Sequence, residues 1–350
     1  MASRPSRLTF IDGTRGIAAL CVLASHLLEE FVPESKSWSR NSFNLGEVGV
    51  VAFFLVSGFV IPLSLERSRS VAAFGVGRIF RIYPLYLAAL VASVGLAWAG
   101  IQPFVEHLGS NQPRFWLTHL LMIQEYAGEG RLNMVEGSWT LFLEMVWYAG
   151  IALLFLLGLN RRTRLLAFLA AVGVAALAVA SLSLDRRLPM GRICLLQSCV
   201  VGMVFFRAYQ QEMKVREAIL WLALNMAATG LAIWTAFGYF QHKEFAFSCV
   251  APSWVAGYAL FFGLFFARES RMAKSWLLDY IGEISYSVYL LHPLVLYTLS
   301  AALGPSWLAF ILTVVLSLLA AHFSYHWIEK SAIQVGKRLL ARMHPSPAAA

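Results

Sequence analysis

The chain has 350 residues, of which 59% are hydrophobic and only 13% are charged, and its mean hydropathy is +0.66. An ordinary soluble domain is about 45–50% apolar and about 25% charged, so this composition excludes both a water-soluble globule and a disordered chain. The net charge is +9, but the basic residues lie between hydrophobic runs, a pattern that indicates membrane topology rather than nucleic-acid binding.

Ten apolar runs follow one another along the chain, each long enough to cross a bilayer as a helix of roughly 20 residues. They predict an all-α polytopic membrane bundle with spans at residues 15–33, 46–65, 78–100, 138–158, 164–184, 191–209, 217–240, 250–267, 277–303 and 306–328. With a cytoplasmic N-terminus, 20 lysines and arginines fall on the inner side and eight on the outer side. The positive-inside rule therefore predicts that both termini are cytoplasmic.

The first predicted helix carries ionisable residues in the segment IDGTRGIAALCVLASH. Arg15 and His26 are eleven residues apart, which is three turns plus about 20°, so both project from one face and lie about 16 Å apart along the axis. Asp12 precedes Arg15 by three residues. An ionisable group inside a membrane is a functional candidate, although a core histidine bonded to a neighbouring helix is the alternative for His26.

The second and third predicted helices each contain one short segment of interest. In FFLVSGF, Ser57 and Gly58 are small residues that predict close helix packing. In GVGRIFRIYPLY, Arg78 and Arg81 are three residues apart and share one helix face. Their guanidinium groups suit phosphate binding, and an ordinary basic flank of a membrane span is the alternative.

The longest outer segment runs from about residue 101 to residue 137. Its apolar and aromatic part, Phe115 to Ile123, is too short to span a bilayer. We expect it either to lie in the membrane interface or to dip into the protein.

Two later spans also carry polar groups. Glu144 in GSWTLFLEMVWY is a single carboxylate in an apolar helix, where it forms either a structural ion pair or part of a site. In ISYSVYLLHP, Ser285, Tyr289 and His292 share one face just before Pro293. That face either lines a cavity or makes ordinary interhelical hydrogen bonds.

The remaining histidines and cysteines do not form a metal-binding pattern. His322 and His326 are four residues apart on the last helix but have no matching acidic motif, so we predict structural histidines and no metal site. We predict that the four cysteines are buried thiols: Cys21, Cys194, Cys199 and Cys249.

Together these segments resemble the acyltransferase 3 family of polytopic membrane acyltransferases. The resemblance extends from Phe10 to about Arg338 and is carried by six segments in the expected order: IDGTRGIAALCVLASH, FFLVSGFVI, RIFRIYPLY, GSWTLFLEMVWY, ISYSVYLLHPLV and WIEK. It implies one transmembrane acyltransferase domain over 1–343 and a short cytoplasmic tail at 344–350. The extracytoplasmic esterase-like domain of some relatives is not expected here.

The resemblance also implies a reaction, the transfer of an acyl group to a hydroxyl group. Acyl-CoA, commonly acetyl-CoA, would be the donor co-substrate, no permanently bound cofactor is expected, and the acceptor would be a saccharide, glycolipid or glycan. The implied catalytic residues are His26, Glu144, Arg15 and Asp12. The implied donor-binding residues are Arg78, Arg81, Arg15 and Tyr83. The residues expected to line the substrate site are Trp139, Ser285, Tyr289 and His292.

Two other functional classes remain open from the residues. A polytopic saccharide or small-molecule transporter would share the ten spans and the buried charges, and a non-catalytic membrane partner of a glycan-assembly complex is the third class. The composition fits a bacterial cytoplasmic membrane, with membrane lipids as partners and no nucleic acid. The sequence gives no indication of the oligomeric state.

Overall fold

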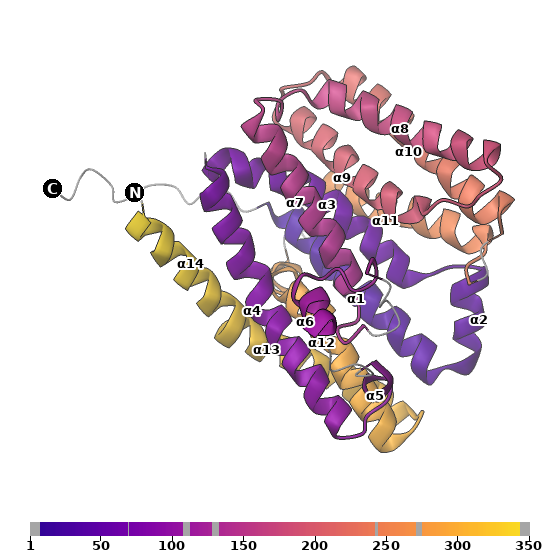
Figure 1. The fold of residues 1–350 in the computed structure, drawn as a ribbon, viewed down its shortest axis with the longest axis vertical. Coiled ribbons are helices and arrows are strands. Elements are labelled where there is room, and N and C mark those ends of the chain that lie inside the picture. Colours follow the sequence, from indigo (N-terminus) through magenta and orange to yellow (C-terminus); the bar gives the residue numbers. More distant parts are fainter. Residues whose placement is uncertain are drawn as a thin grey trace. The chain divides into compact units, whose positions relative to one another are not determined.

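The computed structural model describes residues 8–68, 70–107, 113–127, 133–241, 244–270 and 275–343, and it is helical almost throughout (Figure 1). The tail at 344–350 therefore lies outside the described residues. The helices, in chain order, are α1 (Thr9–Phe31), α2 (Pro33–Asn41), α3 (Leu45–Ser68), α4 (Val71–Trp98), α5 (Phe104–His107), α6 (Pro113–Leu120), α7 (Ser138–Leu156), α8 (Thr163–Ser183), α9 (Met190–Tyr209), α10 (Val215–Ile233), the π-helix η2 (Trp234–Tyr239), α11 (Phe247–Phe266), α12 (Trp276–Leu303), α13 (Trp307–Ser324), the π-helix η3 (Tyr325–Glu329) and α14 (Lys330–Met343).

Ten helices in the described part of the chain are long and apolar enough to cross a membrane, which confirms the predicted fold class. Several predicted ends were wrong. The first and third spans begin at Thr9 and Val71, earlier than predicted, and the last helical run continues to Met343. Hydropathy marks only the part of a helix that suits lipid, whereas the backbone continues through polar residues wherever a cap or a packing partner is present. Ser70, for example, caps α4 by accepting a hydrogen bond from the backbone N–H of Ala73 at 3.3 Å.

The helices gather into two compact units. Unit 1 comprises Met1–Leu63 and Leu143–Glu283, and unit 2 comprises Ser64–Phe142 and Ile284–Ala350. Each unit is therefore built from two separate stretches of chain.

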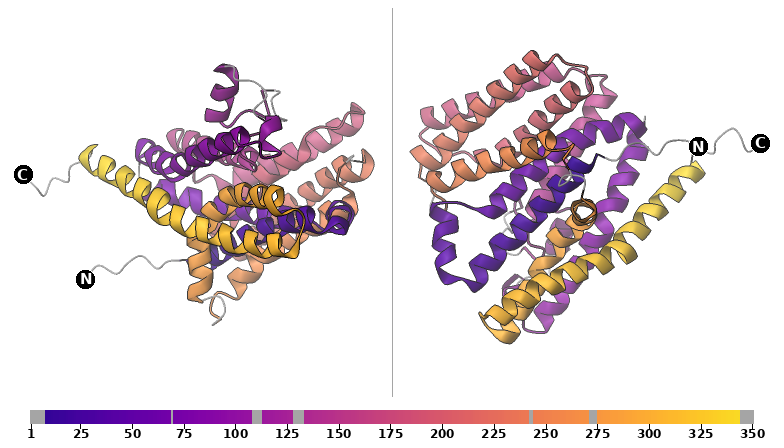
Figure 2. Two further views of the ribbon diagram at one scale, coloured as in Figure 1. Left: turned by 90° about the horizontal axis from the view of Figure 1, so that it is seen from below. Right: turned by 180° about the vertical axis from the view of Figure 1, so that it is seen from behind.

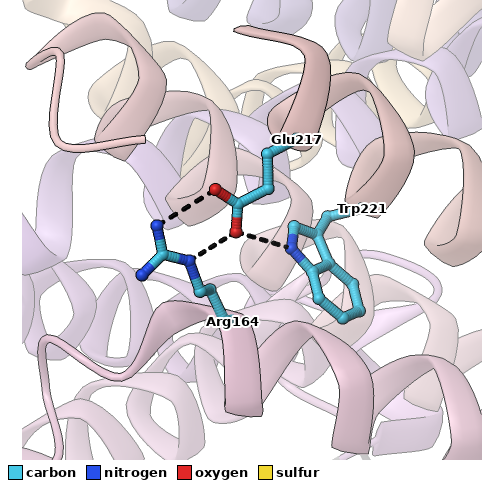
Figure 3. Close-up of polar contacts among 3 residues, drawn as sticks. All are labelled: Arg164, Glu217 and Trp221. Atoms are coloured by element: carbon cyan, nitrogen blue, oxygen red, sulfur yellow. Dashed lines mark hydrogen bonds and ion pairs between the residues drawn. The ribbon is translucent and has the colours of Figure 1, made fainter. Parts of the chain in front are cut away.

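Within unit 1, α8, α9 and α10 pack against one another. Their shared core is the buried cluster of Ala167, Val204, Met213 and Ala218. At the edge of this group Arg164 of α8 pairs with Glu217 of α10, which also accepts a hydrogen bond from the indole N–H of Trp221 at 3.4 Å (Figure 3). These contacts join α8 to α10, and the paired residues Arg164 and Glu217 are 53 positions apart in the sequence.

Glycines set the closest helix contacts of unit 1. A Cβ added to Gly58 of α3 would lie 1.9 Å from the carbonyl oxygen of Cys199 on α9, and one added to Gly202 would lie 2.1 Å from the carbonyl oxygen of Leu55. The predicted close packing at Gly58 is therefore confirmed. In the same way, a Cβ on Gly282 at the start of α12 would lie 2.2 Å from the carbonyl oxygen of Asp12 on α1.

Within unit 2, α14 packs along α4, and the two helices lie side by side in both Figure 1 and Figure 2. The two helices touch at Gly336, where an added Cβ would lie 2.9 Å from the Cβ of Phe80. The second half of α12 also contacts α4, since the Tyr286 hydroxyl donates to the carbonyl oxygen of Ile82 at 2.8 Å. Ser287 donates to the buried carboxylate of Glu329 in η3 at 3.2 Å.

The outer segment between α4 and α7 packs into the protein on one side. Phe115, His119 and Gln124 are fully buried, whereas Leu117 and Leu120 are exposed. Tyr86 of α4 donates to the carbonyl oxygen of His119 at 2.6 Å. The segment thus has one buried face and one exposed apolar face, and its place relative to the membrane stays a prediction.

Candidate functional site

The ionisable residues of the first helix lie on one unbroken α-helix in unit 1. Asp12, Arg15 and His26 are each partly buried on α1. Because α1 is continuous from Thr9 to Phe31, Arg15 and His26 keep the common face that their spacing predicts. The N-terminal part of α1 is fixed by the close contact between the backbone of Asp12 and Gly282.

A second group of polar side chains surrounds the end of α1 that carries His26. Ser25, next to His26, donates to Glu29 at 3.2 Å. Glu47 at the start of α3 accepts a hydrogen bond from the indole N–H of Trp254 at 2.6 Å. Neither carboxylate stood out in the sequence, because both lie close to the ends of apolar runs, where acidic residues are common.

Glu144 makes the most informative contacts of the predicted site residues. Its Oε1 accepts a hydrogen bond from the hydroxyl of Tyr148 at 2.5 Å and another from the hydroxyl of Ser57 at 3.2 Å. Tyr148 is one turn further along α7, whereas Ser57 comes from α3. Both donors reach the same oxygen, so they fix the orientation of the carboxylate in the membrane-embedded part of unit 1.

Ser57 is held in place by the residue that follows it. Gly58 approaches the backbone of Cys199 so closely that α3 and α9 cannot shift apart without losing that contact. The FLVSGF segment therefore does two things at once: Gly58 positions α3, and Ser57 contacts Glu144. Packing alone was predicted for these two residues, and the bond from Ser57 to Glu144 adds a polar function to the segment.

The two arginines of the third span lie on α4 in unit 2, and both are partly buried. An Nη2 of Arg78 donates to the hydroxyl of Ser64 at 3.0 Å, and its guanidinium carbon lies 5.5 Å from the ring centroid of Phe74. These contacts hold the Arg78 fork in one orientation, which is the condition for recognising a planar or tetrahedral anion. Tyr83, on the same helix, packs edge-to-face against Tyr86 at 6.4 Å between ring centroids.

The predicted lining residues lie in unit 2 around the start of α7. The Tyr289 hydroxyl is 2.8 Å from that of Thr140, the residue after Trp139, which is itself partly buried. Ser285 and His292 are fully buried, and Nδ1 of His292 lies 2.9 Å from the carbonyl oxygen of Val288. The observed bonds are of the interhelical and intrahelical kind, and α12 runs through Pro293 as one helix.

The predicted site residues are therefore divided between the two units. Unit 1 contains Asp12, Arg15, His26 and Glu144, and unit 2 contains the residues predicted to bind the donor and to line the substrate site: Arg78, Arg81, Tyr83, Trp139, Ser285, Tyr289 and His292. The residues that sequence reasoning missed are Ser57 and Tyr148 as partners of Glu144. Tyr148 had a signal, since it lies four residues after Glu144, but the pairing with Ser57 depends on tertiary packing.

The cysteines, His322 and His326 lie outside the predicted site residues. Cys194, Cys199 and Cys249 are buried free thiols, as predicted, whereas Cys21 is only partly buried. The rings of His322 and His326 are 4.6 Å apart between centroids. Within the described ranges, no three His, Cys, Asp or Glu side chains come together in a group that could hold a metal ion.

Comparison with known proteins identifies the relatives of this chain. The profile of a family described as an acyltransferase domain, Acyl_transf_3, matches residues 8–325. The chain is 25% identical over 320 residues to "Acyltransferase MdmB" of Streptomyces mycarofaciens, an alignment that covers 85% of this chain and 81% of that protein. It is 28% identical over 324 residues to "Nodulation protein 10" of Rhizobium leguminosarum bv. viciae, covering 84% of each chain. No solved structure matches the chain.

Proposed function

This chain belongs to the acyltransferase 3 family, and from that premise we propose that it is a membrane O-acyltransferase that moves an acetyl group from acetyl-CoA to a hydroxyl of a saccharide or lipid-linked glycan. The observation that carries the proposal is the family match, which extends over residues 8–325 and includes all the ionisable residues assigned a role. The ten candidate spans make it a multi-pass membrane protein, and we assign it to a bacterial cytoplasmic membrane.

The proposed reaction forms one ester bond and breaks one thioester bond. The acceptor hydroxyl oxygen attacks the thioester carbonyl carbon while His26 removes the hydroxyl proton, and the CoA sulfur leaves and is protonated. In a second route, the His26 imidazole first attacks the thioester to give an acyl-histidine, which the acceptor hydroxyl then cleaves. Both routes yield the same ester and free CoA, and both need a neutral imidazole at the start.

The other residues have supporting roles in this proposal. Glu144 positions the acceptor or orients His26, and the two donors to its Oε1 support a fixed carboxylate. Arg78 and Arg81, with Tyr83 beside them, hold the CoA phosphates, and the bond from Arg78 to Ser64 supports a guanidinium oriented in advance.

The first helix contributes Arg15 and Asp12 to the proposed site, in addition to His26. Arg15 either adds to donor binding or pairs with Asp12, and both residues lie on α1, which also carries His26. Keeping these groups on one rigid helix favours a fixed distance between the cation and the imidazole, which is how an enzyme lowers a barrier by positioning.

The first experiment measures acetyl-CoA binding to the full chain in lipid nanodiscs by calorimetry. We expect binding to the wild type, loss of at least tenfold in affinity in the Arg78→Ala/Arg81→Ala double variant, and nearly unchanged affinity in His26→Ala. In a transfer assay with a panel of methyl glycosides as acceptors, His26→Ala is expected to have no measurable turnover. If no acyl-CoA binds to the wild type, the proposal fails and the transporter becomes the better explanation.

A further inference from the structure

We infer that α14 completes the donor site: Lys337 and Lys330 form, together with Arg81 of α4, a cationic surface that binds the phosphates of the acyl-CoA nucleotide. The inference rests on the proposed function, because it names a further part of the same donor site.

α4 and α14 are in close contact at Phe80 and Gly336. On each helix, the residue after the contact is basic, Arg81 and Lys337, and the residue before it is apolar. In an α-helix those neighbours are turned by about 100° to opposite sides of the contact. At this contact each helix therefore has a basic residue on one side and an apolar residue on the other.

The two helices run in opposite directions, and this decides how the flanks combine. They are the third and tenth of ten consecutive spans, so they cross in opposite senses, and Figures 1 and 2 show them running antiparallel. Viewed down the common axis of the pair, successive residues go clockwise around one helix and anticlockwise around the other. The residues that follow the contact, Arg81 and Lys337, therefore lie on the same side of the pair.

The exposed fractions agree with this arrangement. On the other side of the pair, Ile79 and Val335 are 49% and 50% exposed, as expected of a surface that faces lipid or the membrane interface. Lys337 is exposed, as is Lys330, which lies seven residues earlier and thus almost directly in line with it. One side of the pair carries Ile79 and Val335, with Arg342 one heptad beyond Val335, and the other carries three cations.

The chemistry of the nucleotide fits this cationic side. The CoA end of the donor carries a pyrophosphate and a 3′-phosphate, so one pair of arginines does not supply a cation for each phosphoryl group. Lys330 and Lys337 are about 10 Å apart along α14, which extends the cationic surface beyond Arg81. Lysine binds phosphate as a compact point charge, and exposure lets its long stem adjust to the ligand.

The chain offers a matched control on the same helix. Arg338 follows Lys337 directly, but it is turned by about 200° from Gly336, so it points away from α4. A headgroup-binding helix would use Arg338 at least as much as Lys337. A donor site on the shared flank would use Lys337 and not Arg338.

The test is calorimetric binding of CoA to the full chain in nanodiscs of zwitterionic lipid. We expect Lys337→Ala to weaken CoA binding about tenfold and Arg338→Ala to change it less than twofold, with Lys337→Arg close to wild type. Both alanine variants replace exposed side chains, and size-exclusion chromatography checks that they fold. Equal effects of the two alanine variants, or no effect of Lys337→Ala, would overturn the inference.

Two further outcomes separate this inference from its premise. If Lys337→Ala leaves CoA binding unchanged and lowers the unfolding temperature only in nanodiscs that contain phosphatidylglycerol, the surface binds lipid headgroups and the inference is wrong. If wild-type protein binds neither CoA nor acetyl-CoA, the proposed function itself fails. If the wild type binds CoA and Lys337→Ala binds it with the same affinity, only the role assigned to α14 is wrong.

Discussion

At the scale of single residues, the contacts of Glu144 show how a carboxylate can be kept in an apolar helix. An isolated carboxylate at mid-membrane is costly, and hydrogen bonds from hydroxyl groups offset part of that cost. Tyr148 and Ser57 provide two such bonds to one oxygen. They act on Glu144 rather than on substrate, so we describe both as positioning residues in the proposed reaction.

Removing the shorter of these bonds should slow the chemical step. For Tyr148→Phe we expect kcat with the best methyl glycoside acceptor to fall about tenfold or more, because a hydrogen bond to a charged group contributes about 1.5–3 kcal/mol. The KM for acetyl-CoA should stay the same, since the donor site lies elsewhere in the proposal. Steady-state kinetics in nanodiscs measure both quantities.

Ser57 and a distant tyrosine supply the comparison for that experiment. Ser57→Ala should have a smaller effect of the same kind, because its bond to Glu144 is longer, and Ser57→Thr should restore activity. Tyr239→Phe changes an exposed ring and should leave the kinetics as they are. A Tyr148→Phe enzyme with normal kcat would show that Glu144 does not need this donor.

Sequence reasoning reached some of these residues and not others, for a physical reason. Glu144 was predicted as an ionisable residue in an apolar helix, and its spacing of four residues from Tyr148 was a signal for that partner, although Tyr148 was not predicted. Ser57 and Glu144 are 87 residues apart, and only the packing of two helices brings them together. The contact between Gly336 and Phe80 was hidden in the same way.

At the scale of helices, the contact between α3 and α9 is the closest approach of two backbones described above. Both sides of it are glycines, Gly58 and Gly202, so the helices touch through their main chains. In a membrane the hydrophobic effect does not drive helices together, and such close packing supplies much of the association energy. The same contact fixes Ser57, and through it Glu144.

A larger side chain at this contact should therefore destabilise the protein. We expect Gly58→Val to cost about 3 kcal/mol, the upper part of the usual range for overpacking, because its Cβ would overlap the carbonyl oxygen of Cys199. The unfolding temperature, followed by tryptophan fluorescence in nanodiscs, should fall by several degrees.

A helical glycine without neighbours is the control for that prediction. Nothing lies within 4 Å of a Cβ built on Gly173 in α8. Gly173→Ala should leave the unfolding temperature unchanged or raise it slightly, since alanine has the higher helix propensity. If Gly58→Val is as stable as Gly173→Ala, the close contact between α3 and α9 does not exist in the membrane.

The helices themselves could be predicted from the sequence, but their ends could not. Each predicted span became one continuous helical run, because lipid satisfies no backbone hydrogen bonds and a span must satisfy its own. The early start of α4 follows from the Ser70 cap, and the late end of α14 follows from its packing on α4. Neither a cap nor a packing partner changes the hydropathy of the residues involved.

At the scale of the whole molecule, neither unit corresponds to one continuous stretch of sequence. Residues with proposed roles are found in both units, and the family match runs over the chain segments of both. The single domain predicted over residues 1–343 and the orientation in the membrane remain predictions. The orientation is the one that can be tested most directly.

Reporter fusions should show both termini in the cytoplasm. We expect green fluorescent protein fused after Ala350 to fluoresce, and alkaline phosphatase fused at the same place to be inactive. A fusion truncated after Trp98, at the end of the third span, should give the opposite result. The reason is the excess of basic residues on the inner side. An active phosphatase at the C-terminus would reverse the orientation or change the number of spans.

The length of the last helical run has a consequence for the kind of bilayer in which the protein works. From Trp307 to Lys330 there are 23 helical steps, or about 35 Å, whereas the hydrocarbon layer of a typical membrane is about 30 Å thick. With Trp307 anchored at one interface, Lys330 clears the opposite edge of the hydrocarbon by at most about 5 Å, because the π-helix η3 within this run rises less per residue than an α-helix. Plasma membranes rich in sterols are a few ångströms thicker, which removes about half of that clearance. A thicker membrane would therefore leave Lys330, the first lysine of α14, closer to the hydrocarbon layer.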